Sequence, residues 1–182
     1  MAKFEPGSIA EYIQQLERLY SDSIPIIKEA VYDGAAVVAD EIKKNLNSLP
    51  VEEARFATPE DPLTGITQRQ KEDLIESFGI SGFEGAGGQS ALRGSDGTNF
   101  INVKLGFDGY GRTHTKKYGW DKTEGRVSEL GKLPNVILAR SVESGTSFRQ
   151  KRPFIRPAVN ASKLRAENAM EKKILEKIEE IV

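Results

Sequence analysis

The residue types that carry most enzyme chemistry are scarce in this chain. Its 182 residues include a single histidine, His114, and no cysteine. Without a second imidazole or a thiolate, the chain lacks the usual ligands of a zinc site and a Cys nucleophile. His114 stands in the run Thr-His-Thr-Lys, which offers no triad of nucleophile, base and orienting acid. We therefore expect a protein that is not an enzyme, with no catalytic residue and no metal or cofactor site.

Acidic pairs are the remaining candidates for acid–base chemistry. Three occur, at Glu52-Glu53, Glu60-Asp61 and Glu72-Asp73. The first two fall in a polar segment with prolines, and the third falls on the surface of a predicted helix. We expect solvated carboxylates at all three, because a working acid–base pair needs environments that shift the two pKa values apart.

A glycine-rich stretch over residues 82–97 is the one candidate for a phosphate-binding loop. It lacks the Gly-Lys-Ser/Thr ending of a P-loop, and no strand and helix frame it as in a dinucleotide-binding motif. Its composition instead predicts a flexible hairpin tip or mobile loop.

Six basic side chains gather around the predicted start of the last helix, with Phe148 and Phe154 among them. The six are Arg149, Lys151, Arg152, Arg156, Lys163 and Arg165. Such a set suits the phosphates of DNA or an acidic protein partner, and a solvated helix start explains it equally well. Arg156 lies in the first turn, where its positive charge is unfavourable to the helix dipole unless a nearby negative group compensates it.

The basic set belongs to a charge gradient along the chain. Lys and Arg number 26 against 27 Asp and Glu, a net charge of -1 that argues against a dedicated nucleic-acid binder. Residues 1–61 carry 6 basic and 12 acidic side chains, whereas residues 101–165 carry 14 and 5. This asymmetry has three interpretations: solvated faces without a role, a nucleic-acid patch, or complementary faces that meet between subunits.

Length and hydropathy bound the architecture that must position these residues. The length suits a single domain over residues 1–182, and 38% of the residues are hydrophobic. No run approaches the ~18 apolar residues of a membrane helix, and the N-terminal residues MAKFEPGS lack the apolar core of a signal peptide. We expect neither a membrane span nor a secretory leader.

Helical periodicity is strongest near the N-terminus. A capping box at Ser8 and Glu11 predicts a helix that ends at a break over Ser21-Asp22-Ser23, so residues 1–22 are expected to form an N-terminal helical extension. A second helix of about six turns is expected from Pro25, with one buried face. Its apolar stripe comprises Ile24, Ile27, Val31, Ala35, Val38, Ile42 and Leu46.

The rest of the chain alternates short elements. Thr67 and Gln70 form a capping box that starts a helix ending at Gly79. Alternation over residues 101–107 predicts a strand, and Asp108-Gly109 predicts a hairpin turn into a returning strand at 111–120. A short helix runs from Pro134 to Gly145, and a long one begins at Pro157. The fold class is α+β: a small antiparallel sheet with a hairpin, packed by N-terminal and C-terminal helices.

Two segments near the C-terminus combine a helix stop with the proline-rich start of another helix. Residues 139–147, Ala-Arg-Ser-Val-Glu-Ser-Gly-Thr-Ser, are followed by Arg-Pro-Phe-Ile-Arg-Pro-Ala at residues 152–158. Together they resemble the "gene product ten" family of tailed-phage tail components, the head–tail joining, tail-completion or tail-terminator proteins. Leu63-Thr64-Gly65 and Ser77-Phe78 are similar to a further segment of that family. Ser144 stands where the family has an aromatic residue.

The residues of this motif have structural explanations. The motif comprises Glu143, Gly145, Thr146, Pro153, Phe154 and Pro157. Gly145 can stop a helix, and Thr146 can form a hydrogen bond within the turn. Pro153 holds the chain extended, Phe154 anchors it to the sheet, and Pro157 presets the first turn of the last helix.

The resemblance implies a function without catalysis. It implies a structural virion protein of the tail or neck, assembled in the cytoplasm of the bacterial host. Such a subunit is expected to form a hexameric ring. The ring caps the tail tube, joins it to the neck or connector and surrounds the DNA in the channel. The acidic N-terminal third and the basic 101–165 segment would then be the two faces of the ring contact. The alternative is a DNA-binding accessory protein that uses the basic 149–165 segment.

Overall fold

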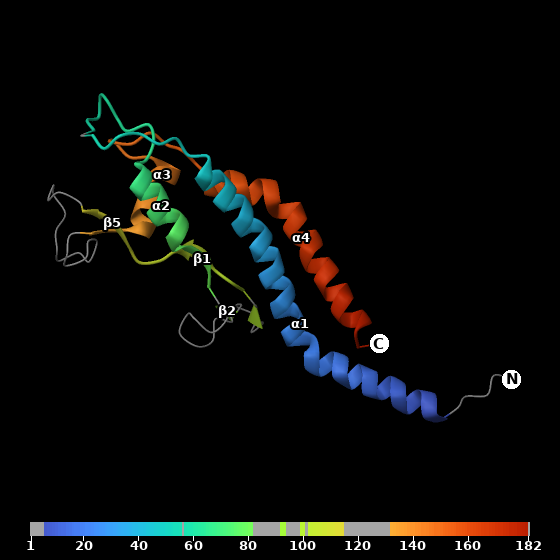
Figure 1. Cartoon of the computed structure of the whole chain (residues 1–182). Coiled ribbons are helices and arrows are strands. Elements are labelled where there is room, and N and C mark those ends of the chain that lie inside the picture. The colour runs from blue at the N-terminus through green and yellow to red at the C-terminus, as the bar shows by residue number, and fades with distance from the viewer. Residues whose placement is uncertain are drawn as a thin grey trace. The chain divides into compact units, whose positions relative to one another are not determined.

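The computed structural model describes residues 6–55, 57–81, 92–93, 99–100, 102–114 and 132–181. In these ranges the chain forms four helices and three two-stranded antiparallel sheets, which confirms the predicted α+β class (Figure 1). The chain divides into two compact units. Unit 1 contains residues 1–37, 82–103 and 164–182, and unit 2 contains residues 38–81 and 104–163. No helix in the described ranges is long and apolar enough to cross a membrane.

Helix α1 (Pro6–Asn47) is continuous, so the predicted break over Ser21-Asp22-Ser23 is wrong. The Oγ atoms of Ser21 and Ser23 donate to the carbonyls of Arg18 (2.8 Å) and Tyr20 (2.9 Å) in the preceding turn, and thus stay within the helix. Pro25 lies inside the helix. Because proline has no N–H, it removes one helical hydrogen bond. Figure 1 shows a bend in this blue part of α1, as proline in a helix produces.

In unit 1, α1 packs against the C-terminal part of helix α4 (Ile155–Glu179). Ion pairs along this contact join Lys173 to Asp33 (3.7 Å) and Lys177 to Glu29 (3.8 Å). The same unit contains strands β2 (Leu92–Arg93) and β3 (Asn99–Phe100), which pair antiparallel. Most of the predicted glycine-rich loop at 82–97 lies outside the described residues.

The buried face of α1 in unit 1 differs from the predicted stripe. Ile26 and Ala30 are buried, whereas Ile24 and Ile27 are 57% and 41% exposed. The side of α1 that faces α4 carries Glu29, Asp33 and Gly34, none of which belongs to the predicted stripe. The helical periodicity was predicted correctly, but in this part of α1 the buried residues are not those of the predicted stripe. In unit 2 the predicted Ile42 and Leu46 are buried.

Unit 2 contains one hydrophobic core. It is formed by the end of α1, helix α2 (Gln68–Ser77), helix α3 (Asn135–Ser144) and the start of α4. Thr67 caps α2 in the predicted capping box: its Oγ1 accepts from the N–H of Gln70, and the Gln70 side chain accepts from the N–H of Thr67. The core residues are Ala39, Ile42, Leu46, Leu49, Ile66, Leu74, Phe78, Leu138, Ala139, Val142, Phe154 and Ala158.

The strands of unit 2 do not form the predicted hairpin. Strand β1 (Phe78–Ile80) pairs with β4 (Leu105–Phe107), and β5 (Tyr110–His114) pairs with β6 (Lys132–Pro134). Phe78 lies opposite Phe107 with ring centroids 5.1 Å apart, so burial of these rings favours β1 as the partner of β4.

Two further sequence predictions change with this pairing. Gly79 was expected to end a helix, but it lies in β1 opposite Gly106. Asp108-Gly109 was expected to join two paired strands, but it joins strands of different sheets, with Gly109 at φ 65°. Residues 115–120 of the predicted returning strand lie outside the described residues.

Candidate functional site

The junction between α3 and α4 contains the predicted structural motif, and Glu143 is its centre. One carboxylate oxygen, Oε2, accepts the backbone N–H groups of Phe154 (2.7 Å) and Ile155 (2.9 Å). The other, Oε1, accepts the N–H of Arg156 (3.0 Å). These are three of the four N–H groups that a helix start leaves without a helical acceptor, and the fourth residue, Pro157, has none. Glu143 therefore caps α4 from the end of α3.

This cap explains how Arg156 is accommodated in the first turn of α4 and where the helix begins. Arg156 in the first turn faces the opposing helix dipole, and the Glu143 carboxylate supplies a negative charge at that helix end. The helix begins at Ile155, two residues before the predicted start at Pro157. Pro157 still lies in the first turn, where proline is tolerated. Sequence reasoning placed Glu143 in the motif but missed its partner, since the capped helix begins 12 residues later.

The turn between the two helices is held by its own backbone. Gly145 ends α3 with φ 75°, and its N–H donates to the carbonyl of Ser141 (3.0 Å). Thr146 and Arg149 exchange backbone hydrogen bonds of 2.9 and 3.2 Å, and the Thr146 Oγ1 accepts from the N–H of Phe148 (3.2 Å). The predicted hydrogen bond of Thr146 within the turn is therefore confirmed.

Phe154 is the apolar anchor that the motif predicts. Its side chain is 1% exposed, and its ring lies edge-on to Phe107 of β4 with centroids 6.1 Å apart. Pro153 precedes it in a segment outside the helices and strands, in which the N–H of Arg152 donates to the carbonyl of Val142 (2.8 Å). The carbonyl of Phe154 accepts from the side chain of Asn45 at the end of α1 (3.1 Å). The motif thus joins α1, α3, α4 and β4 of unit 2.

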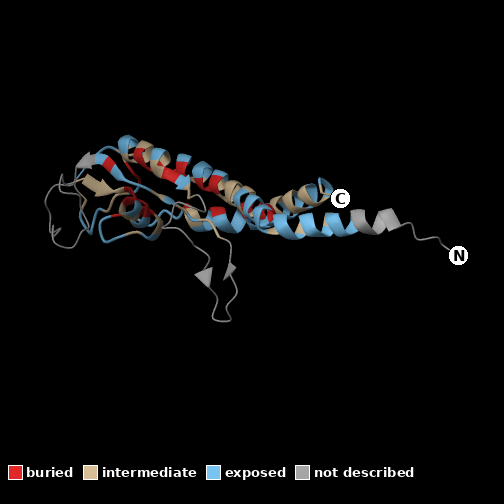
Figure 2. Ribbon diagram, turned by 90° about the horizontal axis from the view of Figure 1, so that it is seen from below, coloured by how far each residue is buried: buried red, intermediate tan, exposed pale blue. Residues whose placement is uncertain are grey.

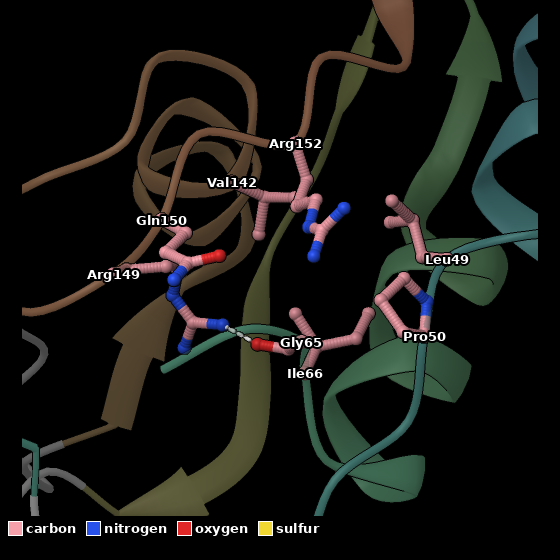
Figure 3. A pocket seen from close by; sticks show the side chains of 8 residues that line it. All are labelled: Leu49, Pro50, Gly65, Ile66, Val142, Arg149, Gln150 and Arg152. Carbon is pink, nitrogen blue, oxygen red and sulfur yellow. Dashed lines mark hydrogen bonds between the residues drawn. The ribbon is translucent and has the colours of Figure 1, made fainter. Parts of the chain in front are cut away.

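Arg149 corrects the predicted basic interface. It is 8% exposed, and its Nη1 donates to the carbonyl of Gly65, as Figure 3 shows. Burial lowers the pKa of Arg149, and the nearby charge of Glu52 acts in the opposite direction. The side chains around it, including Leu49, Ile66 and Val142, leave no room for a water molecule. Arg149 therefore fastens the 62–66 segment to the turn and is not an exposed phosphate contact.

The 62–66 segment also binds Glu52, which belongs to one of the acidic pairs and precedes the segment in the sequence. Its Oε2 accepts from the N–H (3.1 Å) and the Oγ1 (2.8 Å) of Thr64. Desolvation raises the pKa of Glu52, but the hydrogen bonds from Thr64 and Gly65 and the charge of Arg55 outweigh it and lower the pKa overall. Glu52 is thus a structural acceptor for this segment rather than the solvated carboxylate that we expected.

The remaining basic residues of the predicted interface are distributed along the turn and α4. Lys151, Arg152, Arg156, Lys163 and Arg165 are exposed. Arg152 also donates from Nε to the carbonyl of Thr64 (3.1 Å). Lys163 ends unit 2, whereas Arg165 belongs to unit 1. Unit 2 therefore contains Lys151, Arg152, Arg156 and Lys163 of the predicted set.

A second charged cluster was not predicted. Asp73, expected to be solvated, is 5% exposed and accepts from the Nε of Arg112 (2.6 Å) and from its backbone N–H (2.8 Å). The hydrogen bond to Asp73 is the main cause that raises the pKa of Arg112. Glu72 binds the same guanidinium at 3.1 Å. The cluster joins α2 to β5, a pairing that no local sequence pattern encodes.

Unit 2 also has a shallow apolar groove of about 300 Å³ beside the motif. Leu105 and Phe107 of β4, Val136 of α3 and Ile155 of α4 line it, and Arg140 lies among them. Val136 is 56% exposed. Glu143 and Ser144 also line it, so the charges of Arg140 and Glu143 offset each other. A concave, mostly apolar surface without net charge suits an apolar side chain of a partner better than a polar substrate.

The described residues contain no group of three or more His, Asp or Glu side chains that would hold a metal ion. The backbone of His114 lies at the end of β5, and its side chain is outside the described set. The hydrogen bonds of Glu143 and Arg149 join separate segments of unit 2 to one another. No protein-family model, curated protein or solved structure matches this chain.

Proposed function

We propose that this chain is a structural, non-enzymatic subunit of the head–tail junction of a tailed phage or phage-tail-like particle. In this role it is a tail-completion or tail-terminator subunit that assembles as a ring, six-fold by analogy with the family it resembles. The ring would cap the tail tube and join it to the neck. Its partners are further copies of itself, the tail-tube and neck proteins, and DNA that passes through without sequence recognition.

The observation that carries this proposal is the α3–α4 junction. The motif residues that resemble the tail-component family converge on one element, in which Glu143 caps α4 and Phe154 enters the core. Each of these residues has a partner within the fold. A site of this kind supports a scaffold that presents surfaces to other subunits.

Charge distribution supports ring assembly. The residues of unit 1 include 8 basic and 13 acidic side chains, a net of -5. Those of unit 2 include 18 basic and 14 acidic side chains, a net of +4. A cyclic ring is built from a heterologous contact, in which two different faces of the subunit meet. Opposite net charges suit such a pair of faces.

The test combines mass measurement with localisation in the particle. Light scattering or native mass spectrometry of the full chain should give a ring-sized oligomer, alone or after addition of purified tails. Electron microscopy with a gold-labelled tag should place the protein at the head-proximal end of the tail. A chain that stays monomeric and is absent from particles would refute the proposal.

The DNA-binding alternative retains support from Lys151, Arg152 and Arg156, which are exposed in the same unit. Duplex DNA binding by the free chain, with affinity that falls steeply as salt rises, would favour this function. Replacing these three residues by glutamine should then abolish binding. Failure of the free chain to bind DNA at ~50 mM salt would remove the alternative.

A further inference from the structure

The N-terminal half of α1 presents an apolar stripe to solvent. Its residues recur at steps of three and four, within a sector of about 120° around the helix. They are Tyr12 (61% exposed), Ile13 (49%), Leu16 (47%), Tyr20 (86%), Ile24 (57%) and Ile27 (41%). Figure 2 shows this part of α1 as largely exposed. We call these six residues the α1 stripe.

The α1 stripe is large enough for a specific interface. Aromatic side chains bury roughly 150–250 Å² each when fully covered, and the smaller Ile and Leu side chains bury less. At the observed exposures the six would bury at most roughly 700 Å² on one side, which approaches the ~800 Å² per partner of a standard protein interface. Scattered apolar residues on a surface need no partner, but a continuous stripe of this area does.

The groove of unit 2 has the complementary chemistry. It offers about 300 Å³ lined by Leu105, Phe107 and Ile155, enough for a large side chain. Arg140 and Glu143 both lie in its lining, so the groove itself carries no net charge and its apolar residues provide the local complementarity. The net charges of -5 on unit 1 and +4 on unit 2 favour contact between these units of two different copies.

We propose that the α1 stripe of one copy docks into the unit 2 groove of a second copy, with Tyr20 as its anchor. This rests on the self-assembly in the proposed function and assigns its contact. Such a contact is heterologous, so it leaves a free groove on one copy and a free stripe on the other. An amphipathic helix in an apolar groove is a common mode of protein recognition.

Exposed residues permit a test that leaves the fold intact. Tyr20→Ser removes the anchor of the stripe, and Val136→Asp puts a carboxylate in the groove. Each should weaken self-association by roughly 30-fold or more in sedimentation velocity, the size of an interface hot spot. The matched controls are Tyr32→Ser (44% exposed), outside the stripe on the same helix, and Val51→Asp (49% exposed), outside the groove in the same unit. Both should change association less than about two-fold.

A mixture of the two variants decides the geometry. The Val136→Asp chain keeps an intact stripe and the Tyr20→Ser chain keeps an intact groove, so together they should form a 1:1 dimer that grows no further. If both variants lose association and the mixture stays monomeric, the stripes do not enter the grooves and the proposal is wrong. Wild-type protein that stays monomeric overturns it too. Rings that both variants still form would overturn this contact while leaving the proposed function in place.

Discussion

Units 1 and 2 differ in how their buried residues are organised. In unit 2 twelve buried hydrophobic residues form one cluster, with Leu46, Leu74 and Phe154 almost fully enclosed. In the described part of unit 1 the buried hydrophobic residues are Ile26, Ala30 and Ala166, and the large side chains of the α1 stripe face solvent. The buried hydrophobic residues of unit 2 therefore form one contiguous core, whereas the described part of unit 1 leaves several large apolar side chains exposed.

The two units also use charge differently. In unit 2 the carboxylates of Glu143 and Asp73 accept hydrogen bonds from backbone N–H groups, and the guanidinium of Arg149 donates to a backbone carbonyl. These hydrogen bonds are buried or partly buried. In unit 1 Lys173 and Lys177 form ion pairs at 3.7–4.0 Å with Glu29 and Asp33, which are about half exposed. Exposed pairs contribute little and weaken with salt. Substitutions should therefore affect stability strongly in unit 2 and weakly in unit 1.

The largest loss is expected from Phe154→Ala. Phe154 is 1% exposed and its ring contacts Phe107, so truncation leaves a cavity in the core of unit 2. The free energy of unfolding in urea should fall by about 4 kcal/mol. The control Phe148→Ala, at a side chain that is 49% exposed, should change it by less than about 0.5 kcal/mol. Equal effects of the two variants would contradict the core assignment.

Gly65→Ala is expected to have the next largest effect. A Cβ at this position would overlap the carbonyl oxygen of Pro50. That carbonyl cannot move freely, because it accepts from the N–H of Ile66 (3.1 Å). We expect a loss of about 2–3 kcal/mol in the free energy of unfolding. Gly79→Ala is the control: no atom lies within 4 Å of its Cβ, and alanine should be neutral or slightly stabilising in this strand. A neutral Gly65→Ala would show that the 50–66 segment adapts easily.

Local patterns in the sequence predicted the elements of unit 2 well. The capping box at Thr67 and Gln70 and the helix from Pro134 to Gly145 are both present. Each is encoded by neighbouring residues, so a short window suffices. Within the motif, the helix stop at Gly145 and the buried anchor Phe154 are likewise present.

Contacts between distant segments could not be predicted in this way. Strands of three residues carry too little alternation to identify a partner, so the pairing of β4 with β1 was missed. Arg149 was assigned to a surface because basic residues surround it in sequence, but its acceptor is Gly65, 84 residues away. In α1, the hydroxyls of Ser21 and Ser23 bond within the helix where their residue types suggested a break.

A smaller effect is expected from removal of the α4 cap. Glu143→Ala deletes the acceptor of three backbone N–H groups, including those of Phe154 and Ile155. Hydrogen bonds to a charged group contribute more than neutral ones, so stability should fall by about 2 kcal/mol. Glu143→Gln keeps one acceptor oxygen and should lose less. Glu60→Ala, at an exposed carboxylate, is the control and should have no measurable effect. A neutral Glu143→Ala would mean that solvent caps α4 equally well.

The pH dependence of the 50–66 segment tests a still weaker contribution. The pKa of Glu52 lies below the ordinary value of 4.5 of a glutamate carboxyl group, so its ionised form is favoured in the fold. Its contribution to stability is therefore complete above pH 4.5 and disappears as the pH falls through the lowered pKa. Hydrogen exchange at the Thr64 N–H, which donates to Glu52, should speed up below that pH relative to Glu52→Gln. The same pH profile in the variant would assign the change to another group.

The smallest change is expected at Gly34 of unit 1. A Cβ there would lie 2.6 Å from the Cγ of Met170, closer than atoms can approach. The obstacle is an unbranched, adaptable side chain rather than a backbone carbonyl, so Met170 can move aside. Alanine in a helix interior is favoured over glycine by about 1 kcal/mol, which offsets the strain. Gly34→Ala should therefore leave the free energy of unfolding within about 0.5 kcal/mol of wild type. A loss as large as that of Gly65→Ala would mean that the contact between α1 and α4 in unit 1 is packed as rigidly as the core of unit 2, and the contrast between the two units would then lie only in the exposed α1 stripe.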